Sequence, residues 1–517
     1  FRSMALAHIP QRVLGQQPQE NPATVVNWFR IDSLRLHDNP AFNYAVTSGL
    51  RFKAIFIVDP WFNASYNSGL SVNVWRFLLE SLHDLDSKLQ KRPYQTRLNV
   101  FVGQPTAILP ELFSRWNVSK LIFQASQVSY ESKQHDEIIQ RMATEHSVEC
   151  VSFFAHTLYN PNDILTCNNG RVPVSYKEFR RLLPIVGCPQ QPIPEPIPEP
   201  NPLSLLTSCG VGTNIAEGEI PTLQSLGFAP SEKLYTNHWV GGETEALSRL
   251  SKFGSHRTDD PIEWLMNKDS FSPYIRFGCL SVRQLFSQLR QFASLRGKAL
   301  LQEMTKDLLL REFAFLVAYF TPNFDQMKGN PLCIQLPWDD NKQYLEVWRQ
   351  GQTGFPWIDA IIRQCRQEGW AHSLARQSIA IFLTRGYMWL SWVLGNEFFQ
   401  EFVLDFELPT STVCWMQSSC SGFFCNQIES YNPCVIGKQM DTEGQYIKTY
   451  VPELQDFPVE YIHQPWNAPQ DIQEEAGCII GVDYPQPIVD VCNQGEQCCK
   501  RIRAIMTALY QVYGTNP

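Results

Sequence analysis

The sequence predicts an α/β domain followed by an all-α domain, and two observations carry this prediction. Between residues 23 and 156, short runs of β-branched and aromatic residues alternate with longer amphipathic stretches. From about Gly241 to Asn396 the strand signals vanish and helical periodicity dominates. Strands and helices that alternate at the first spacing need crossover connections, so we expect a mostly parallel sheet with helices on both faces.

The expected elements follow in chain order. Strands are predicted at Val25–Phe29, Ala54–Val58, Leu98–Val102, Leu121–Gln124 and Cys150–Phe154, with helices at Val74–Leu89 and Lys133–Glu145. Seven prolines between Pro189 and Pro202 predict an extended linker, because proline lacks an N–H donor and fixes φ. Further helices are expected at Cys279–Arg290, Leu374–Leu394 and Lys500–Tyr513. We therefore set the α/β domain at 23–156, a connector at 157–240 and the helical domain at 241–515.

Composition excludes several classes of protein. The 517 residues carry 43 Lys plus Arg against 51 Asp plus Glu, and the net charge of −8 argues against a protein that coats nucleic acid over its whole surface. No apolar run reaches the roughly 20 residues that span a bilayer, so we expect no membrane segment. The 15 cysteines are scattered, and Cys414, Cys420 and Cys425 lack the paired spacing of a zinc site. Free thiols in a reducing compartment and no metal are expected.

A helix start near residue 270 is a candidate phosphate-binding site. Ser272 suits the N-cap and Pro273 the first helical position, so free N–H groups and the positive end of the helix dipole should point at Lys268–Ser272. Most helix starts of this kind are structural, however, so this pattern leaves both interpretations open.

Tryptophans are concentrated in the helical domain. Those within about eighty residues are Trp338, Trp348, Trp357, Trp370, Trp389, Trp392 and Trp415. Trp389 and Trp392 are spaced i, i+3, which predicts that they share a helix face. Core packing explains such a cluster, but a row of indoles also offers electron-transfer steps to a buried redox cofactor. Spacing alone does not choose between the two.

Arg376 lies on the predicted apolar helix, one turn after His372. A guanidinium on such a face is rarely unpaired, so we expect a carboxylate beside it. Asp405 and Glu407 are the two candidates. A purely structural salt bridge is the alternative to a functional pair.

Nine short motifs occur together in this chain. They are Trp28-Phe-Arg with Leu34-Arg-Leu-His-Asp-Asn-Pro40, Gly241-Gly-Glu-Thr244, Phe271-Ser-Pro-Tyr274, Arg276-Phe-Gly-Cys-Leu-Ser281, Arg311-Glu-Phe313, Gly351-Gln-Thr-Gly-Phe-Pro356, Phe382-Leu-Thr-Arg385 and Tyr450-Val-Pro-Glu-Leu454. In this order they resemble the photolyase/cryptochrome family, specifically its animal branch, over roughly residues 23–515. The resemblance implies a Rossmann-like N-terminal domain and a helical C-terminal domain that binds FAD noncovalently, together called the photolyase homology region.

The resemblance also implies roles for single residues. It assigns Lys268, Asp269, Ser270, Phe271 and Ser272 to the FAD phosphates, and Asp307, Arg311, His372, Arg376, Asp405, Glu407 and Ser411 to the rest of the cofactor site. Within that set, Arg376 and Asp405 match the salt bridge beside the flavin ring, and Ser411 matches the residue that faces flavin N5. Trp415, Trp392 and Trp338 match the family's electron-transfer tryptophans, with Trp389 as the fourth member. Trp348 is interpreted as packing.

Departures from the family pattern indicate which activity was lost. Ser373 and Gln377 stand where repair enzymes for 6-4 photoproducts have two histidines, and neither side chain can act as an imidazolium acid. Leu310 stands where photolyases for cyclobutane dimers have a tryptophan that stacks on the flipped base. Asp307 replaces the usual Gln or Glu, and Glu407 replaces the second acid of the usual Asp-x-Asp. The cofactor site is therefore expected to remain without the repair pocket.

The leading hypothesis is a cryptochrome: a blue-light photoreceptor and not an enzyme, with FAD photoreduced through tryptophans and signalling or clock proteins as partners. A light-driven DNA photolyase of the 6-4 type and a light-independent clock-type transcriptional repressor are the alternatives. We expect cytoplasmic and nuclear localisation and weak or absent DNA binding. The sequence does not predict an antenna chromophore, the oligomeric state or the identity of the partners.

Overall fold

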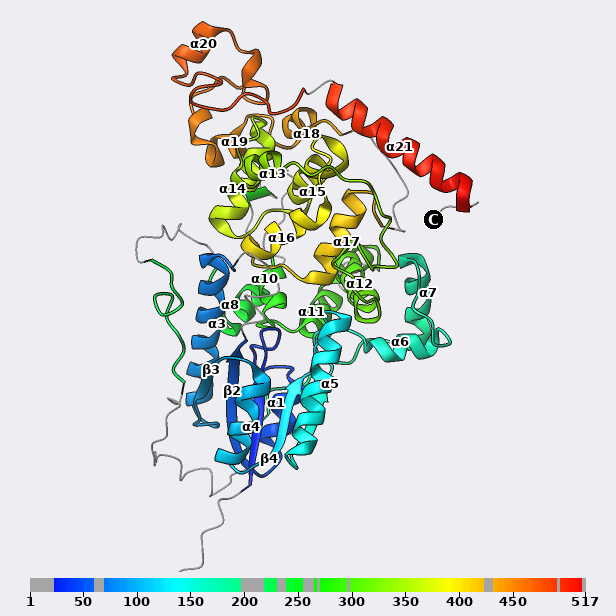
Figure 1. Ribbon diagram of the computed structural model, residues 1–517. Helices are drawn as coiled ribbons and strands as arrows, with labels where there is room; N and C mark the ends of the chain where they lie inside the picture. Colours follow the sequence, from blue (N-terminus) through cyan, green and yellow to red (C-terminus); the bar gives the residue numbers. More distant parts are fainter. Residues whose placement is uncertain are drawn as a thin grey trace, which may run out of the picture.

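The computed structural model describes residues 23–59, 69–196, 218–229, 239–253, 265–266, 270–294, 298–422, 431–490 and 493–513. The α/β domain and the helical domain are stacked end to end, with the sheet at the bottom of Figure 1 and the C-terminal helix at the top right. Lys268, Asp269 and the second half of the proline-rich segment lie outside the described residues.

The α/β domain contains one parallel sheet. Its strands are β1 (Thr24–Phe29), β2 (Arg51–Val58), β3 (Leu98–Val102), β4 (Val118–Gln124) and β5 (Glu149–Phe153). They are ordered β3-β2-β1-β4-β5, and every neighbouring pair is parallel. The predicted parallel sheet is confirmed, although β2 and β4 each begin three residues earlier than expected. The extra residues, such as Arg51 and Lys53, are only half-buried, so they lack the apolar signal of a strand interior.

Helices cover both faces of this sheet, as predicted. They are α1 (Pro40–Val46), α3 (Val72–Gln90), α4 (Pro105–Arg115) and α5 (Tyr130–Glu145). Residues of α3 pack with Phe29 and Phe56 on one face, whereas α4 and α5 pack with Trp28 and Ile55 on the other. After β5, α6 (Pro161–Cys167) and α7 (Tyr176–Val186) lead out of the sheet domain.

The rest of the fold is helical. Its helices are α8 (Glu243–Ser251), α10 (Ser272–Arg276), α11 (Val282–Ser294), α12 (Lys298–Phe320), α13 (Lys342–Gln350), α14 (Pro356–Glu368), α15 (Ser373–Ile381), α16 (Trp392–Phe402), α17 (Leu408–Ser418), α18 (Pro433–Met440), α19 (Gln445–Tyr450), α20 (Gln470–Glu475) and α21 (Asn493–Tyr513). Within the described part of residues 241–396 there is no β-strand beyond isolated bridges, so the all-α prediction is confirmed. Helix α17 packs against α12, α15 and α16 and lies at the centre of the domain.

The prediction of one long helix over Leu374–Leu394 is wrong. Instead of a continuous helix over Leu374–Leu394, α15 ends at Ile381, a short π-helical turn covers Phe382–Gly386, and α16 begins at Trp392. Thr384 has non-helical backbone angles, and Trp389 has a φ of 52°. Trp389 and Trp392 therefore do not share a helix face. The apolar pattern continues through the break because the connecting residues Met388, Trp389 and Leu390 are buried as well.

The helix start near residue 270 also differs from the prediction. Helix α10 begins at Ser272 with Phe271 in the cap position, and no side chain caps it. The Ser272 hydroxyl is engaged with Asp405 instead, as described below. With only five residues, α10 offers a short dipole and a weak case for phosphate binding by the helix end alone.

Polar side chains join the two domains. Glu243 of α8 accepts backbone N–H groups from Leu36 and His37 and forms an ion pair with Lys88, 2.8 Å apart. Arg283 of α11 forms a bidentate ion pair with the buried Asp38. Because these contacts tie α8 and α11 to the loop after β1, the helical domain is fixed on the carboxyl side of the sheet.

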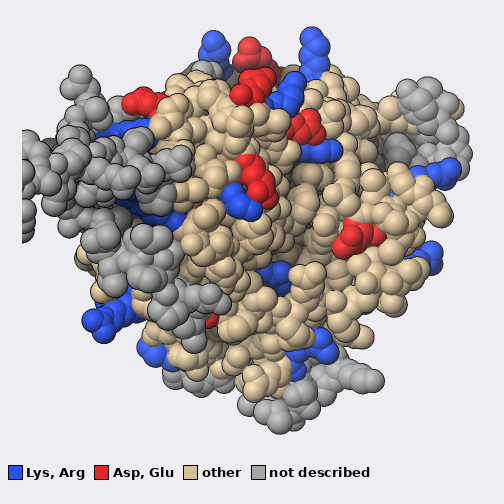
Figure 2. Space-filling view, turned by 90° about the horizontal axis from the view of Figure 1, so that it is seen from below, with Lys and Arg blue, Asp and Glu red and all other residues tan. Residues whose placement is uncertain are grey.

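Seen from below, the surface of the molecule shows Lys and Arg interspersed with Asp and Glu, without a continuous basic field (Figure 2). Where the structure describes the chain, no helix is both long and apolar enough to cross a membrane. The described cysteines form no disulfide, and no group of three or more His, Cys, Asp or Glu side chains among the described residues is arranged to hold a metal ion.

Candidate functional site

Asp405 lies at the centre of a buried polar cluster between α10 and α15. Its carboxylate oxygens lie 2.8 and 2.9 Å from Arg376 Nη2, and the Ser272 hydroxyl donates to Oδ2 at 2.5 Å. Arg376 also donates from Nε to the carbonyl oxygen of Ala371, at 2.7 Å. The structure thus pairs Arg376 with Asp405 and not with Glu407.

The charge state of this pair is fixed by its surroundings. Burial disfavours the charged form of Arg376, but the adjacent Asp405 outweighs burial and the pKa of the guanidinium is raised. Asp405 is itself almost completely enclosed, with a side chain that is 6% exposed. Its Oδ1 receives no aligned hydrogen bond from any described residue. The cluster therefore presents a buried, negatively charged acceptor that one further N–H group can satisfy.

The other predicted site residues fall into two groups. His372 lies close enough to both Arg376 and Asp307 for each to act on its charge, which places these three residues in one group. Burial lowers the pKa of His372, with Arg376 as a further cause, so the imidazole is neutral near pH 7. Ser270 extends the cluster, because its hydroxyl oxygen lies 2.8 Å from that of Ser272.

Arg311 and Glu407 form a separate cluster at the junction of the two domains. Arg311 donates from Nε and Nη2 to the two carboxylate oxygens of Glu407, at 2.7 and 2.6 Å. It also donates from Nη1 to the backbone carbonyl of His156, at 3.0 Å. Burial would raise the pKa of Glu407, but Arg311 and His156 lower it to about 2. Every donor direction of Arg311 is taken by protein groups, so this pair joins α12, α17 and the loop after β5.

Ser411 of α17 donates its hydroxyl hydrogen to Asn396 Oδ1, at 2.7 Å. Asn396 is a buried residue of α16 whose amide in turn reaches Thr412 at 3.4 Å. Sequence reasoning missed Asn396, although an asparagine amid the apolar residues of α16 was the available signal. The contact directs the Ser411 proton toward Asn396, so Ser411 offers an oxygen rather than a free O–H on its other side.

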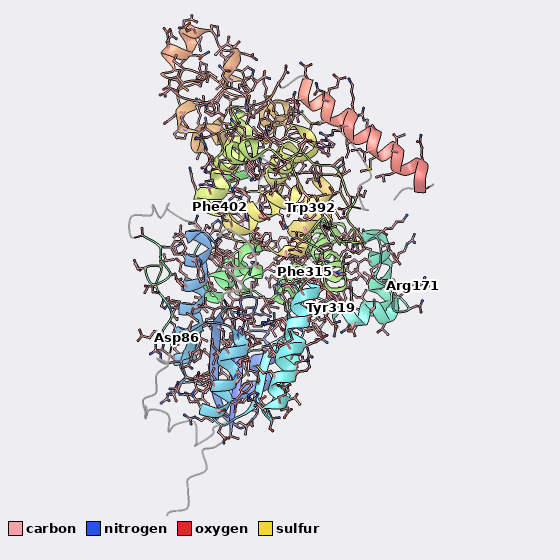
Figure 3. All side chains as sticks on the ribbon, viewed as in Figure 1. Asp86, Arg171, Phe315, Tyr319, Trp392 and Phe402 are labelled. Atoms are coloured by element: carbon pink, nitrogen blue, oxygen red, sulfur yellow. The ribbon has the colours of Figure 1, made fainter. Side chains whose placement is uncertain are left out.

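Trp415 and Trp392 lie in the interior of the helical domain, where Figure 3 labels Trp392 between the helices. Trp415 packs against α16 at Gly395: a Cβ at that residue would lie 2.0 Å from Trp415 Cη2. Trp392 begins α16 one turn before Gly395 and so faces the same side. Trp348, interpreted as packing, lies 6.4 Å from Trp415 between ring centroids and 5.0 Å from Phe398.

The two outer tryptophans contact each other directly. The ring centroids of Trp338 and Trp389 are 5.2 Å apart, and the Trp389 indole N–H donates to the carbonyl oxygen of Pro337 at 2.9 Å. Trp389 is buried, whereas Trp338 is half-buried. The break between α15 and α16 makes this contact possible, since it turns Trp389 toward the Leu336–Asp339 segment.

The residues that depart from the repair enzymes face solvent. Leu310 of α12 is 37% exposed, and Ser373 and Gln377 of α15 are exposed as well. Leu374, beside Ser373, is 45% exposed. Leu310 lies one turn after Asp307 on α12, and Ser373 and Gln377 lie on α15 with Arg376, so these residues share helices with predicted cofactor-site residues.

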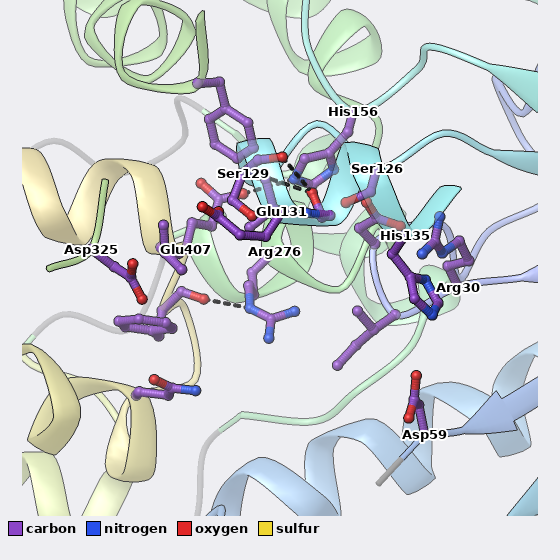
Figure 4. A pocket seen from close by; sticks show the side chains of 18 of the residues that line it. Arg30, Asp59, Ser126, Ser129, Glu131, His135, His156, Arg276, Asp325 and Glu407 are labelled. Atoms are coloured by element: carbon purple, nitrogen blue, oxygen red, sulfur yellow. Dashed lines mark hydrogen bonds and ion pairs between the residues drawn. The ribbon is translucent and has the colours of Figure 1, made fainter. Parts of the chain in front are cut away.

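A cavity of about 440 Å³ lies between the domains. It is lined at the carboxyl ends of β1, β2 and β4 by residues such as Trp28, Asp59 and Ser126, and on the helical side by Arg276, Phe406 and Glu407. Figure 4 shows Arg276 directed into this space, with its Nε bonded to the Phe406 carbonyl. The sequence analysis did not identify this cavity, although the switch in strand order between β1 and β4 is where open α/β sheets bind ligands.

Comparison with known proteins places this geometry in a family. The family described as FAD binding domain of DNA photolyase matches residues 304–504, and the family described as DNA photolyase matches residues 25–201. Cryptochrome-2 of Gallus gallus is 40% identical over 508 residues, which cover 95% of this chain and 84% of that protein. Cryptochrome-1 of Mus musculus is 39% identical, with coverage of 95% and 81%.

Solved structures share the fold. A cryptochrome from Synechocystis superposes with a TM-score of 0.79 at 25% identity, covering 93% of this chain and 99% of that one. A class III photolyase from Agrobacterium tumefaciens also gives a TM-score of 0.79, at 23% identity and with coverage of 96% and 100%. The second likeness supports the fold alone.

Fold and site together define a flavoprotein with a photolyase-type FAD-binding domain. The chain belongs to the photolyase/cryptochrome family, and the curated relatives at 39–40% identity are animal cryptochromes. FAD fits the residues present, because the buried Asp405 Oδ1 accepts no aligned hydrogen bond from a described residue and could accept one from an N–H group such as the flavin ring imide.

Proposed function

We propose that the protein is a cryptochrome-type blue-light photoreceptor that signals to protein partners and does not repair DNA. The observation that carries the proposal is a contrast within one site. The enclosed Ser272–Asp405–Arg376 cluster is formed, while the exposed residues Leu310, Ser373 and Gln377 supply neither an acid nor a stacking ring. A retained cofactor site beside a dismantled lesion site favours light sensing over repair.

In this proposal, Asp405 and Arg376 hold the flavin ring, and Lys268, Asp269, Ser270, Phe271 and Ser272 hold the phosphates, with Asp307 and His372 nearby. Bound FAD supplies absorption of blue light and a strong electron acceptor. Arg311 and Glu407 act on the site indirectly, since their pairing fixes the segment that carries Asp405.

The tryptophans supply the electron. Trp415 donates first, and the positive charge then moves through Trp392 to Trp338 and Trp389. Burial of the inner members keeps water away, and the 5.2 Å contact of the outer pair lets charge be shared between two indoles. Asn396 holds the Ser411 proton, so Ser411 is a poor proton donor to the site.

Signalling or clock proteins are the proposed partners, in the cytoplasm and nucleus, with weak or absent DNA binding. A light-independent clock-type repressor is a second candidate, which the exposed apolar side chains of Leu310 and Leu374 favour as a surface for a protein partner. A 6-4 photolyase is disfavoured by Ser373 and Gln377, and illuminated repair assays on damaged DNA would revive it.

The deciding experiment is an absorption spectrum of the purified full chain in darkness and after blue light. Flavin bands that bleach on illumination support the photoreceptor, and the change should be lost in Trp415→Phe. The matched control is Trp348→Phe, which removes another buried indole beside Trp415 and should leave bleaching intact. Gly395→Ala should also slow bleaching, because its Cβ would collide with the Trp415 ring. Protein that binds no flavin but still binds its partner in darkness would favour the repressor.

A further inference from the structure

Helix α21 closes the outer end of the tryptophan set. Trp389 is 1% exposed, and it packs in one apolar cluster with Leu336 and with Cys498 and Ile502 of α21. Near the start of the same helix, Gly495 lies against the hydroxyl of Tyr387, where a Cβ would come within 3.2 Å. The outermost indole of the set is thus covered by the C-terminal helix and not by solvent.

Arg501 of α21 contacts Trp389 and its surroundings in three ways. Its guanidinium carbon lies 4.4 Å from the centroid of the Trp389 ring. Its Nη2 donates to the carbonyl oxygen of Pro337 at 3.0 Å, the same oxygen that accepts the Trp389 indole N–H. Its Nη1 and Nη2 form a bidentate ion pair with Asp339, at 3.1 and 2.9 Å.

Asp339 is attached to Trp389 as well as to Arg501. Its backbone N–H donates to the carbonyl oxygen of Trp389 at 2.9 Å. A positive side chain therefore lies over the indole, and its negative partner is anchored to the backbone of the same tryptophan. Arg501 and Asp339 are 41% and 52% exposed, so their fields are partly screened by water.

The two charges act oppositely on an indole that has lost an electron. A neutral indole attracts the guanidinium through the negative face of its ring. Once the indole carries a positive charge, the same contact becomes repulsive, whereas a nearby carboxylate stabilises the charge. The indole N–H donates to a backbone carbonyl, which is not a base, so this contact gives the oxidised ring no route to lose its proton and its charge.

We propose that Arg501 and Asp339 set how far outward the positive charge settles: Arg501 disfavours Trp389 relative to Trp338, and Asp339 offsets this effect. Both are positioning residues for charge. The inference rests on the proposed photoreceptor function. The electron that leaves Trp389 moves inward through Trp338, Trp392 and Trp415 to photoexcited oxidised flavin, which is the oxidant. No bond forms or breaks.

Two neutral variants of the FAD-loaded full chain test the proposal. After a blue flash, transient absorption should show a tryptophan radical cation that lives at least about threefold longer in Arg501→Gln and at least about threefold shorter in Asp339→Asn. Removing either charge from the neighbourhood of Trp389 shifts the balance between the two indoles by about that factor. Lys500→Gln and Glu496→Gln are matched controls. They break an ion pair of 2.7 Å on the solvent side of the same helix and should leave the lifetime unchanged.

The opposite signs separate electrostatics from mere anchoring. Both test variants break the same ion pair, so a purely structural role would move both lifetimes in one direction and would overturn the proposal. Hydrogen exchange of α21 in darkness gives a light-independent measure of anchoring, and we expect a similar loss of protection in both variants. In a Trp389→Phe background neither variant should change the lifetime, and a persisting effect would also overturn the proposal.

Failure of the proposed function has a different signature. In that case the parent protein itself gives no tryptophan radical, and Trp415→Phe changes nothing. If instead the parent gives a radical that depends on Trp415 while Arg501→Gln and Asp339→Asn match the parent, the photoreceptor stands and only the charge pair is refuted.

Discussion

Two arginine–carboxylate pairs have their carboxylates two residues apart, on the segment Asp405-Phe406-Glu407. The pairs differ in whether every carboxylate oxygen accepts a hydrogen bond. Arg311 and Glu407 satisfy each other from two directions, with His156 closing the remaining side. Arg376 and Asp405 leave one buried carboxylate oxygen without a hydrogen bond among the described residues. Similar chemistry thus serves two purposes: the complete pair joins domains, and the incomplete pair can bind something else.

The segment geometry explains how neighbours diverge. Glu407 is the cap residue of α17 and has extended backbone angles, φ −114° and ψ 121°. Asp405 and Glu407 are only two residues apart, but their side chains need not point to the same side, because a helix begins at this place. A glutamate carries one methylene more than an aspartate, which lengthens its reach toward Arg311 on α12. The replacement of the family's second Asp by Glu407 is therefore consistent with a role between domains.

The largest expected effect is on stability, from Glu407→Gln. It removes the bidentate partner of the buried Arg311 and leaves only the longer ion pair with Glu312, at 3.5 Å, and breaking a buried pair of this kind costs about 3–5 kcal/mol. Chemical denaturation followed by circular dichroism measures the loss. The control is Glu453→Gln, which breaks the more exposed pair of Arg363 and Glu453 and should cost about 1 kcal/mol or less. Equal losses in the two variants would contradict a special role for the interdomain pair.

The next effect is a pH dependence of stability to which the complete pair contributes. The pKa of Glu407 is lowered to about 2 in the folded protein, from an ordinary value near 4.5. The folded state therefore binds fewer protons than the unfolded state between these values, and stability is lost as pH falls through this window. The full contribution, about 3 kcal/mol, is present above pH 5. Between pH 6 and pH 3, the free energy of unfolding should fall more steeply with decreasing pH for the parent than for Glu407→Gln. Equal slopes in the two proteins would refute the assignment.

Asp405→Asn should have the opposite profile to Glu407→Gln. We expect a smaller change in the free energy of unfolding and a clear loss of bound cofactor. An amide neutralises the acceptor that faces the site, and one charge-assisted hydrogen bond is worth about 1.5–3 kcal/mol, so FAD affinity should fall at least about tenfold. Flavin retained after gel filtration and fluorescence titration of released FAD both measure it. An Asp405→Asn protein that keeps its flavin while losing stability like Glu407→Gln would abolish the contrast between the two pairs.

The sequence predicted the sheet better than the helical domain for a physical reason. Parallel strands are buried on both faces, so β1 and β3 are marked by short apolar runs with little ambiguity. The break between α15 and α16 is different, because it depends on tertiary contacts such as the hydrogen bond from Asp339 to Trp389. Ser391, which caps α16 with its side chain, was the local signal that was available.

The candidate site was predictable only where one residue implied another. An arginine on an apolar helix requires a carboxylate, and the structure selects Asp405 of the two candidates. The destination of Glu407 was not predictable, since His156 and Arg311 are 251 and 96 residues away from it. The same holds for Arg501 of α21 and Trp389 of the segment that precedes α16, which meet only in the folded chain.

The smallest expected effect concerns Ser272, which separates cofactor binding from simple packing. Its hydroxyl donates to Asp405 Oδ2, so Ser272→Ala removes one of the two side chains that orient the carboxylate while leaving Arg376 in place. The substitution disturbs the orientation of the carboxylate but keeps its charge, so FAD affinity should fall by roughly fivefold, about 1 kcal/mol and less than in Asp405→Asn. Ser81→Ala is the matched control, because the buried Ser81 hydroxyl donates to the backbone carbonyl of Phe77 within α3 and not to the carboxylate. An equal loss of FAD affinity in Ser81→Ala and Ser272→Ala would show that the effect comes from packing and not from the orientation of Asp405.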